Sequence, residues 1–203
     1  MTTTQLSSSN DMAKETAPSL PATIENPFNG ERITFLVNGQ ETNGEYVKAK
    51  IELPAEATGP PMVYHLAYTE AFEVLQGQLD LAIGGKKDHR VLAAGEKAFV
   101  PLSTLHRFWN SSNEPAVFIV EVRPARQFEA MMRAICGLAN DGKANKAGPT
   151  NIWEFALFII LSESYVMGPP IFLQKGLFSL LGRIARWKGY DPDFSQYTRP
   201  QTV

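Results

Sequence analysis

The sequence predicts a mainly β fold, a sandwich or barrel, followed by about three α-helices. Between residues 31 and 123, short apolar and β-branched runs alternate with turn residues. Beyond Pro124 the apolar residues recur every three or four positions, as they do on one face of a helix. The chain has 203 residues, 44% of them hydrophobic and 20% charged, which is the composition of a globular protein with one core.

The β-type segments follow one another at short intervals. Turn-forming sequences such as NGQETNG and PAEATGPP separate them, and Gly84-Gly85 suggests a hairpin. The expected strands lie in RITFLV (32–37), EYVKAKIEL (45–53), MVYHL (62–66), AFEVLQGQLDLAIG (71–84), HRVLAAGEKAFVPL and AVFIVEV (116–122). Many short strands with frequent turn signals favour a closed or two-layered β architecture.

Three helices are expected after the strands. In the first, Phe128 begins an apolar stripe three or four residues apart, and Asp141-Gly142 ends the helix. The second begins after Asn151, a suitable N-cap, and runs to about Met167. The third begins near Pro170 and ends near Gly189.

These patterns divide the chain into a disordered tail (1–22), a β domain (23–124) and a helical extension (125–203). The tail is rich in Ser and Thr and lacks the apolar segment of a secretory signal. Cys136 is the single cysteine, expected in the core, so no disulfide framework is expected and a cytoplasmic location is predicted. A net charge of -2 gives no electrostatic footprint for nucleic acid.

The apolar run FALFIIL (155–161) is too short to span a membrane, so no transmembrane segment is expected. The third helix carries basic residues among Leu, Phe and Ile, which favours packing on the β domain or on a second subunit. On these grounds we expect a homodimer. The alternative for this helix is an interfacial position on a membrane surface.

The segment GEKAFVPLSTLHRFWN (95–110) resembles the second sequence motif of the cupin superfamily. That motif reads G, five residues, P, any residue, G, two residues, H, three residues, N. This chain supplies Gly95, Pro101, His106 and Asn110 at the matching intervals. Ser103 stands at the second glycine, a position in a turn where serine is tolerated.

The segment VYHLAYTEAFEVLQG (63–77) resembles the first cupin motif, which reads H, any residue, H, three or four residues, E, six residues, G. Glu70 and Gly77 match its end, and His65 then matches the second histidine, so that Val63 occupies the first. The other alignment makes His65 the first histidine but needs a deletion before the glutamate. The resemblance covers about residues 50–123 and implies a jelly-roll β-barrel.

The resemblance implies that His65, Glu70 and His106 bind one divalent metal ion. Strand alternation supports this independently, because Glu70 shares a face with apolar Phe72 and would be a buried carboxylate. Such a group needs a cation, strong hydrogen bonds or a raised pKa. Two histidines and a carboxylate also form the ligand set of non-haem Fe(II) oxygenases, although Zn, Ni, Mn or Co are further candidates.

Two functions follow from this constellation. The first is a metal-dependent enzyme acting on a small organic molecule, with Phe72 and Phe108 in the pocket wall. The resemblance implies oxygenation, isomerisation, cyclisation or decarboxylation as its range of reactions. The second is a non-catalytic cupin that binds a small molecule without metal, which the missing histidine at Val63 favours. Individual catalytic residues are not identified. His89 is expected at the surface, and Glu121 with Arg123 as an ion pair at the rim.

Overall fold

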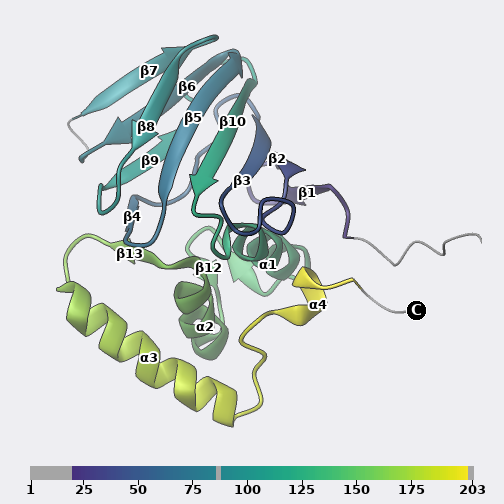
Figure 1. The fold of residues 1–203 in the computed structure, drawn as a ribbon, viewed down its shortest axis with the longest axis vertical. Coiled ribbons are helices and arrows are strands. Elements are labelled where there is room, and N and C mark those ends of the chain that lie inside the picture. Colours follow the sequence, from purple (N-terminus) through teal and green to yellow (C-terminus); the bar gives the residue numbers. More distant parts are fainter. Residues whose placement is uncertain (1–19, 86–87, 201–203) are drawn as a thin grey trace, which may run out of the picture.

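The computed structural model describes residues 20–85 and 88–200, and Figure 1 shows two β-sheets above a group of helices. Most of the predicted tail, residues 1–19, lies outside the described residues. The larger sheet has the strand order β1-β2-β3-β10-β5-β8, and the smaller has the order β13-β4-β9-β6-β7. The fold is therefore mainly β with C-terminal helices, as the sequence predicts.

Every strand pairs antiparallel with its neighbours in these sheets. The strands are β1 (Thr23–Asn26), β2 (Glu31–Val37), β3 (Val47–Leu53), β4 (Val63–His65), β5 (Thr69–Gln76), β6 (Gln78–Ile83), β7 (His89–Ala93), β8 (Lys97–Val100), β9 (His106–Trp109), β10 (Ala116–Arg123) and β13 (Ser164–Val166). The predicted hairpin at Gly84-Gly85 is confirmed, because β6 pairs with β7. The long run 71–84 divides at Gly77, whose φ of +73° favours glycine.

The core lies between the two sheets. Strands β3 and β10 alternate strictly between buried and half-buried residues, as strands with one face on a core do. Phe108 of the smaller sheet contacts Phe72 and Phe118 of the larger one, with ring centroids 6.0 and 5.2 Å apart. The aromatic contacts join the two layers around the strands that carry the candidate metal ligands.

The helical extension contains α1 (Phe128–Asn140), α2 (Ile152–Ser162), α3 (Ile171–Trp187) and α4 (Ser195–Thr198), with a small hairpin of β11 (Ala144–Asn145) and β12 (Gly148–Pro149). The predicted first and third helices are confirmed, and Asn151 caps α2 by accepting from the backbone N–H groups of Trp153 and Glu154. Helix α1 packs against β1, α2 and α4. Its buried Arg133 binds Glu129 and the carbonyl of Pro21, and so joins the extension to the first described residues.

The predicted end of the second helix near Met167 is wrong. Helix α2 ends at Ser162, and Glu163 takes a left-handed conformation with φ 50°. The next residues form β13, which pairs with β4 through Ser164↔His65 and Val166↔Val63. A free edge of the smaller sheet competes for this segment, and hydrogen bonds to that edge replace the last helical turn.

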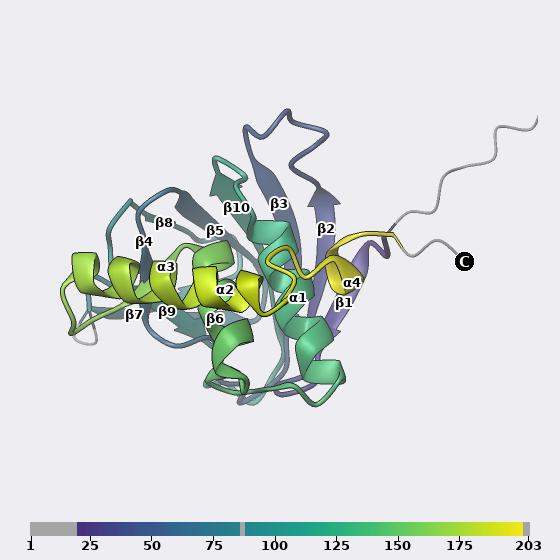
Figure 2. The ribbon, with the colours of Figure 1, turned by 90° about the horizontal axis from the view of Figure 1, so that it is seen from below.

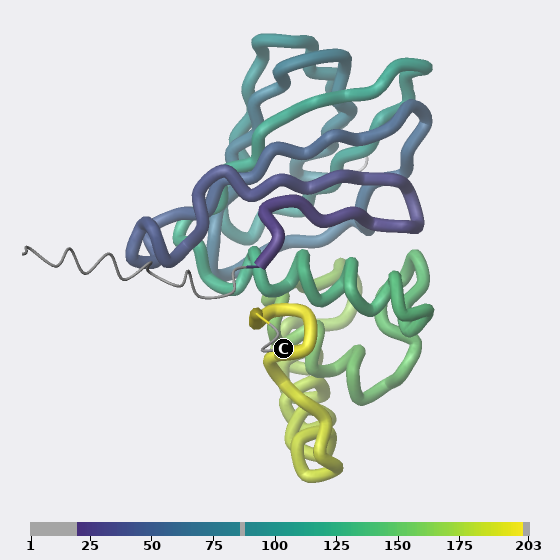
Figure 3. Tube along the Cα trace, turned by 90° about the vertical axis from the view of Figure 1, so that its right-hand side faces the viewer, coloured from purple at the N-terminus to yellow at the C-terminus, as the bar shows by residue number. Residues whose placement is uncertain are grey.

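Helix α3 lies at the side of the extension that is remote from the sheets (Figures 1 and 3). Seen from below, it crosses in front of the other elements, so one long side of it faces outward (Figure 2). It packs on α2 through its opposite side. Among the described residues, no helix is both long and apolar enough to cross a membrane.

Candidate metal centre

His65, Glu70 and His106 come together from three strands in the space between the sheets. His65 ends β4, His106 begins β9 beside it, and Glu70 lies in β5 of the opposite sheet. Their side chains are 8%, 9% and 5% exposed, respectively. His106 Nε2 lies 2.7 Å from Glu70 Oε2, and His65 Nε2 lies 3.9 Å from Glu70 Oε1. The structure thus brings together the three residues that the sequence singles out as ligands.

Hydrogen bonds on the far side of each imidazole orient the ring. His106 donates from Nδ1 to the carbonyl of Thr104, 3.0 Å away, which leaves Nε2 directed at Glu70. His65 Nδ1 lies 3.3 Å from the hydroxyl oxygen of Ser164. Tyr68 stacks on the His65 ring with centroids 4.2 Å apart. Such partners fix which ring nitrogen is available to a metal.

The electrostatics of the cluster favour an ionised carboxylate. Burial alone would raise the pKa of Glu70, but the hydrogen bond and the charge of His106 lower it below its usual value. Burial lowers the pKa of His65 to about 4, so this ring is neutral at pH 7. The pKa of His106 is raised, because the hydrogen bond and charge of Glu70 outweigh the effect of burial. A metal ion would have to displace the proton on His106.

The donor set fits a divalent ion. The candidate ligand atoms of the three residues all lie within 4.8 Å of one another. Ligand atoms held by one ion at about 2.1 Å are themselves roughly 3 to 4 Å apart, so only small shifts separate this arrangement from a bound one. One carboxylate and two neutral imidazoles suit Fe, Zn, Ni, Mn or Co. The same cluster without metal is a hydrogen-bonded ion pair beside a neutral histidine.

Val63 stands two residues before His65 on β4, directly opposite His106 in the register. Alternation along a strand places it on the same face as His65. Its side chain offers no ligand atom. Among the described residues, the cluster therefore supplies three candidate protein ligands. An ion held there would keep more open positions than one with four protein ligands.

Two residues of the second motif organise the loops around the cluster. Ser103 has φ 60°, the left-handed region that glycine favours, and its N–H donates to the carbonyl of His65 at 2.7 Å. Asn110 donates from its amide to the carbonyls of Pro54 and Glu114. These contacts hold the chain on both sides of β9.

The sequence reasoning missed the part of the extension that adjoins the cluster. Tyr68 donates its hydroxyl to the carbonyl of Ser162, and Ser164 faces His65. Arg126 binds Glu163 through two hydrogen bonds of 2.9 and 2.6 Å, and so holds the turn between α2 and β13. Tyr68 stands within the first motif, so its position beside His65 has a signal in the sequence. Ser164 lies 99 residues from His65 and carries no local signal.

The other residues singled out take the following places. Phe72 and Phe108 lie in the aromatic core, and their contact with a substrate stays a prediction. His89 is exposed, as expected, and binds Asp80 at 2.8 Å. Cys136 is buried, and burial raises its pKa to about 12, which fits a core residue. Arg123 binds Glu121 at 2.6 Å, which confirms the predicted ion pair.

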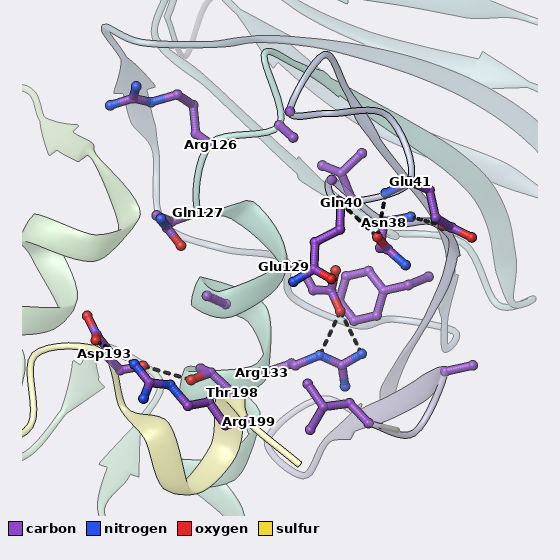
Figure 4. Close-up of a pocket in the computed structure, with 18 of the residues that line it drawn as sticks. Asn38, Gln40, Glu41, Arg126, Gln127, Glu129, Arg133, Asp193, Thr198 and Arg199 are labelled. Atoms are coloured by element: carbon purple, nitrogen blue, oxygen red, sulfur yellow. Dashed lines mark hydrogen bonds and ion pairs between the residues drawn. The ribbon is translucent and has the colours of Figure 1, made fainter. Parts of the chain in front are cut away.

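A separate cavity of about 940 Å³ lies between the loop 38–44, the start of α1 and the end of the chain that follows α4 (Figure 4). Four of its charged wall residues form two ion pairs, Arg133 with Glu129 and Arg199 with Asp193. Leu20 and Pro200, at the ends of the described ranges, also line it. None of the predicted site residues lies in its wall.

Residues 49–122 match the family model of the cupin domain. Solved structures similar to this chain include a sugar phosphate isomerase from a cupin superfamily of Silicibacter pomeroyi, with 22% identity over 48% of this chain and 61% of that one, and a TM-score of 0.42. An RmlC-like cupin from Shewanella frigidimarina has 25% identity, covers 51% and 84%, and has a TM-score of 0.42. A predicted oxalate decarboxylase from Thermotoga maritima has 17% identity, covers 52% and 92%, and has a TM-score of 0.45.

These similarities extend over about half of this chain, and at such TM-scores they carry no argument about activity. No curated protein matches the sequence significantly. The family match spans both sequence motifs and all three candidate ligands. Residues 49–122, which carry both motifs and the three candidate ligands, are therefore similar to the cupin domain.

Proposed function

We propose that the protein binds one divalent metal ion through His65, Glu70 and His106 and acts as an enzyme on a small organic molecule. The observation that supports this most strongly is the convergence of two imidazoles on one buried carboxylate between the sheets. Burying an ionised carboxylate costs several kcal/mol, and a cation compensates for that cost. The backbone and hydroxyl partners of both rings preorganise the ligands.

A bound ion would polarise a substrate oxygen as a Lewis acid or, as iron, provide a redox centre. The protein residues would bind and orient the substrate. Phe72 and Phe108 are the proposed apolar contacts. Phe72 lies on the same strand as Glu70 and Phe108 on the same strand as His106, and each is two residues from that ligand, so it shares the ligand's face of the strand. Tyr68 adds a hydroxyl beside His65, and burial raises its pKa well above its usual value, so it stays protonated. The similarity of residues 49–122 to the cupin domain leaves oxygenation, isomerisation, cyclisation and decarboxylation as candidate reactions.

A second function is favoured by one specific observation. The 2.7 Å contact between His106 and Glu70 already satisfies the carboxylate without a metal, and Val63 leaves the first histidine position apolar. In that case the protein is a metal-free cupin that binds a small molecule between its sheets. The two functions differ in a single measurable property, which is the metal content of the protein.

Metal analysis of protein purified without an affinity tag tests the proposal. We expect near-stoichiometric metal, or recovery of one equivalent when Fe(II), Zn(II), Ni(II) or Mn(II) is added to chelator-treated protein. Binding should weaken as the pH falls, because protons compete for the imidazoles and the carboxylate. Protein that is isolated without metal and takes up none of these ions would establish the metal-free alternative instead.

The homodimer and the cytoplasmic location also stay predictions. For a dimer, β8 offers an edge of the larger sheet, and its Phe99 is 58% exposed. Unpaired edges readily bind a second chain. Light scattering should give a dimeric mass that Phe99→Glu reduces to that of a monomer. A monomeric mass for the unmodified protein would contradict this prediction.

A further inference from the structure

Helix α3 carries an exposed apolar stripe along its outer side. Leu173, Leu177, Leu180, Ile184 and Trp187 are spaced alternately four and three residues apart, so they share one face of the helix. Four of them are exposed, and Ile184 is half-buried. Leu173, Leu177 and Leu180 are 54–56% exposed, and Trp187 is 84% exposed. Phe172 and Met167 extend the apolar surface at the start of the helix, with 69% and 67% exposure.

The same helix presents a second, inner face to the protein. Gln174, Gly182 and Ala185 are buried there. The closeness of this packing is clear at Gly182, where an added Cβ would meet Ile160 of α2 at 2.4 Å. Because the inner face already anchors α3 on α2, the apolar stripe is not needed to hold the helix in place. The exposure of its leucines and of Trp187 places the stripe on the outward side of the helix.

The charges around the stripe all have one sign. Between Ser164 and Tyr190 the sequence contains Lys175, Arg183, Arg186 and Lys188 and no acidic residue. None of these four cations forms an ion pair with any residue that the structure describes. On a helix projection Arg183 and Lys188 flank the stripe on its two sides. Lys175 and Arg186 lie on the opposite side of the helix, in the wall of a pocket that Glu163 also lines. The surface therefore combines exposed apolar residues with unneutralised positive charge.

We propose that the outer side of α3 docks on the surface of an anionic phospholipid bilayer. A helix with Trp, Phe and Leu on one face and only Lys and Arg among its charged residues lies in the plane of a membrane interface, with its cations at the headgroups. The inner face remains on α2, so docking leaves the fold intact. This inference is independent of the metal site and of the proposed reaction.

The charges favour a lipid surface over a second copy of the same helix. Two α3 stripes packed together would bring Arg183 and Lys188 of one chain near the same two cations of the other, with no acidic residue on either helix to pair with them. Helices that associate through an apolar seam normally set opposite charges beside it. An anionic bilayer instead neutralises the two cations that flank the stripe.

Flotation of the full chain with phosphatidylcholine vesicles, with and without phosphatidylserine, tests the proposal. We expect binding to the anionic vesicles to be at least about 100-fold stronger and to weaken with salt, because each basic residue adds to the attraction. The fluorescence of the exposed Trp187 should shift to the blue on binding, and this shift should be absent in Trp187→Phe.

The variant Leu177→Gln/Leu180→Gln should lose at least about tenfold in affinity for anionic vesicles, since two apolar side chains no longer enter the interface. The matched control is Leu36→Gln/Leu75→Gln, which changes two leucines that are 47% and 45% exposed on the strands. This control should bind like the unmodified protein. Circular dichroism checks that both variants remain folded.

Three results would overturn the proposal. They are failure to float with anionic vesicles, equal binding to phosphatidylcholine alone, and equal loss in the control variant. A dimeric mass in light scattering that Leu177→Gln/Leu180→Gln reduces to a monomer would assign the stripe to a second copy instead.

Discussion

Replacing Glu70 with glutamine should lower the affinity for a divalent metal by more than about 100-fold, since even residues that only orient metal ligands are worth 10- to 100-fold. The amide has nearly the same shape and can still hydrogen-bond to His106, but it carries no charge and is a poor ligand. Because Glu70 is buried between both imidazoles, no other carboxylate in the described cluster can replace it. Isothermal titration with Zn(II) or Ni(II) on chelator-treated protein measures the change.

Glu73→Gln is the matched control for this experiment. Glu73 lies three residues further along the same strand, on the opposite face, where it binds the exposed Lys97 at 3.1 Å. We expect unchanged metal affinity and a change in stability below about 1 kcal/mol, as for other surface ion pairs. If Glu70→Gln and Glu73→Gln retained equal metal, the ion would lie elsewhere and the assignment of His65, Glu70 and His106 would be wrong.

The strands of the β domain were largely predictable, because the patterns that indicate them lie within short segments of the sequence. Alternation in EYVKAKIEL and AVFIVEV matches the alternating burial of β3 and β10. The three candidate ligands lie in two motifs whose spacing is read directly from the sequence. Turn signals also located the β6–β7 hairpin. Hydrophobic periodicity and motif spacing suffice to predict a strand when one face of that strand packs on a core.

The boundary between α2 and β13 was not predictable in the same way. FALFIILSESYVM (155–167) contains no proline or glycine that would end a helix, and the sequence predicts a second helix that runs to about Met167. What ends it is tertiary: the free edge of β4 pairs with β13, and Arg126 holds Glu163 in the turn. Helix propensity is only a weak determinant of structure, and such tertiary contacts override it.

The same limitation applies to the surroundings of the candidate metal centre. The sequence identifies His65 through its motif but not Ser164, which approaches it from the extension. Nor does the sequence show that Glu163 and Ser162 lie beside Tyr68 and Arg126. Contacts between residues about a hundred positions apart produce no periodic pattern in the sequence. The extension thus forms part of the environment of His65, a relation that only the three-dimensional structure reveals.

A buried carboxylate outside this centre should make the stability of the protein depend on pH. Glu31 begins β2 and is 6% exposed. Burial raises its pKa from 4.5 to about 7, although hydrogen bonds with Asn29 and Asn26 oppose the change. No ion pair with Glu31 occurs among residues 20–85 and 88–200. Its ionised form is therefore unfavourable in the folded protein.

The sign of the effect follows from proton binding in the two states. Between pH 4.5 and about 7 the folded protein keeps the proton on Glu31 while the unfolded chain releases it. Rising pH therefore favours unfolding over this window, and the stability that the raised pKa provides below pH 4.5 is lost by the time the pH exceeds about 7. The difference of about 2.5 pH units corresponds to roughly 3 kcal/mol.

Glu31→Gln should consequently be more stable than the unmodified protein at about pH 8, by up to roughly 3 kcal/mol, and of similar stability near pH 4. Urea unfolding of both proteins across this pH range, after treatment with a chelator, measures the difference in their free energies of unfolding at each pH. Contributions from the histidines cancel in that difference, because both proteins contain them. Glu25→Gln, an exposed position on the neighbouring strand β1, should give no such pH dependence. A stability difference for Glu31→Gln that is independent of pH would show that the carboxylate is not held protonated in the fold.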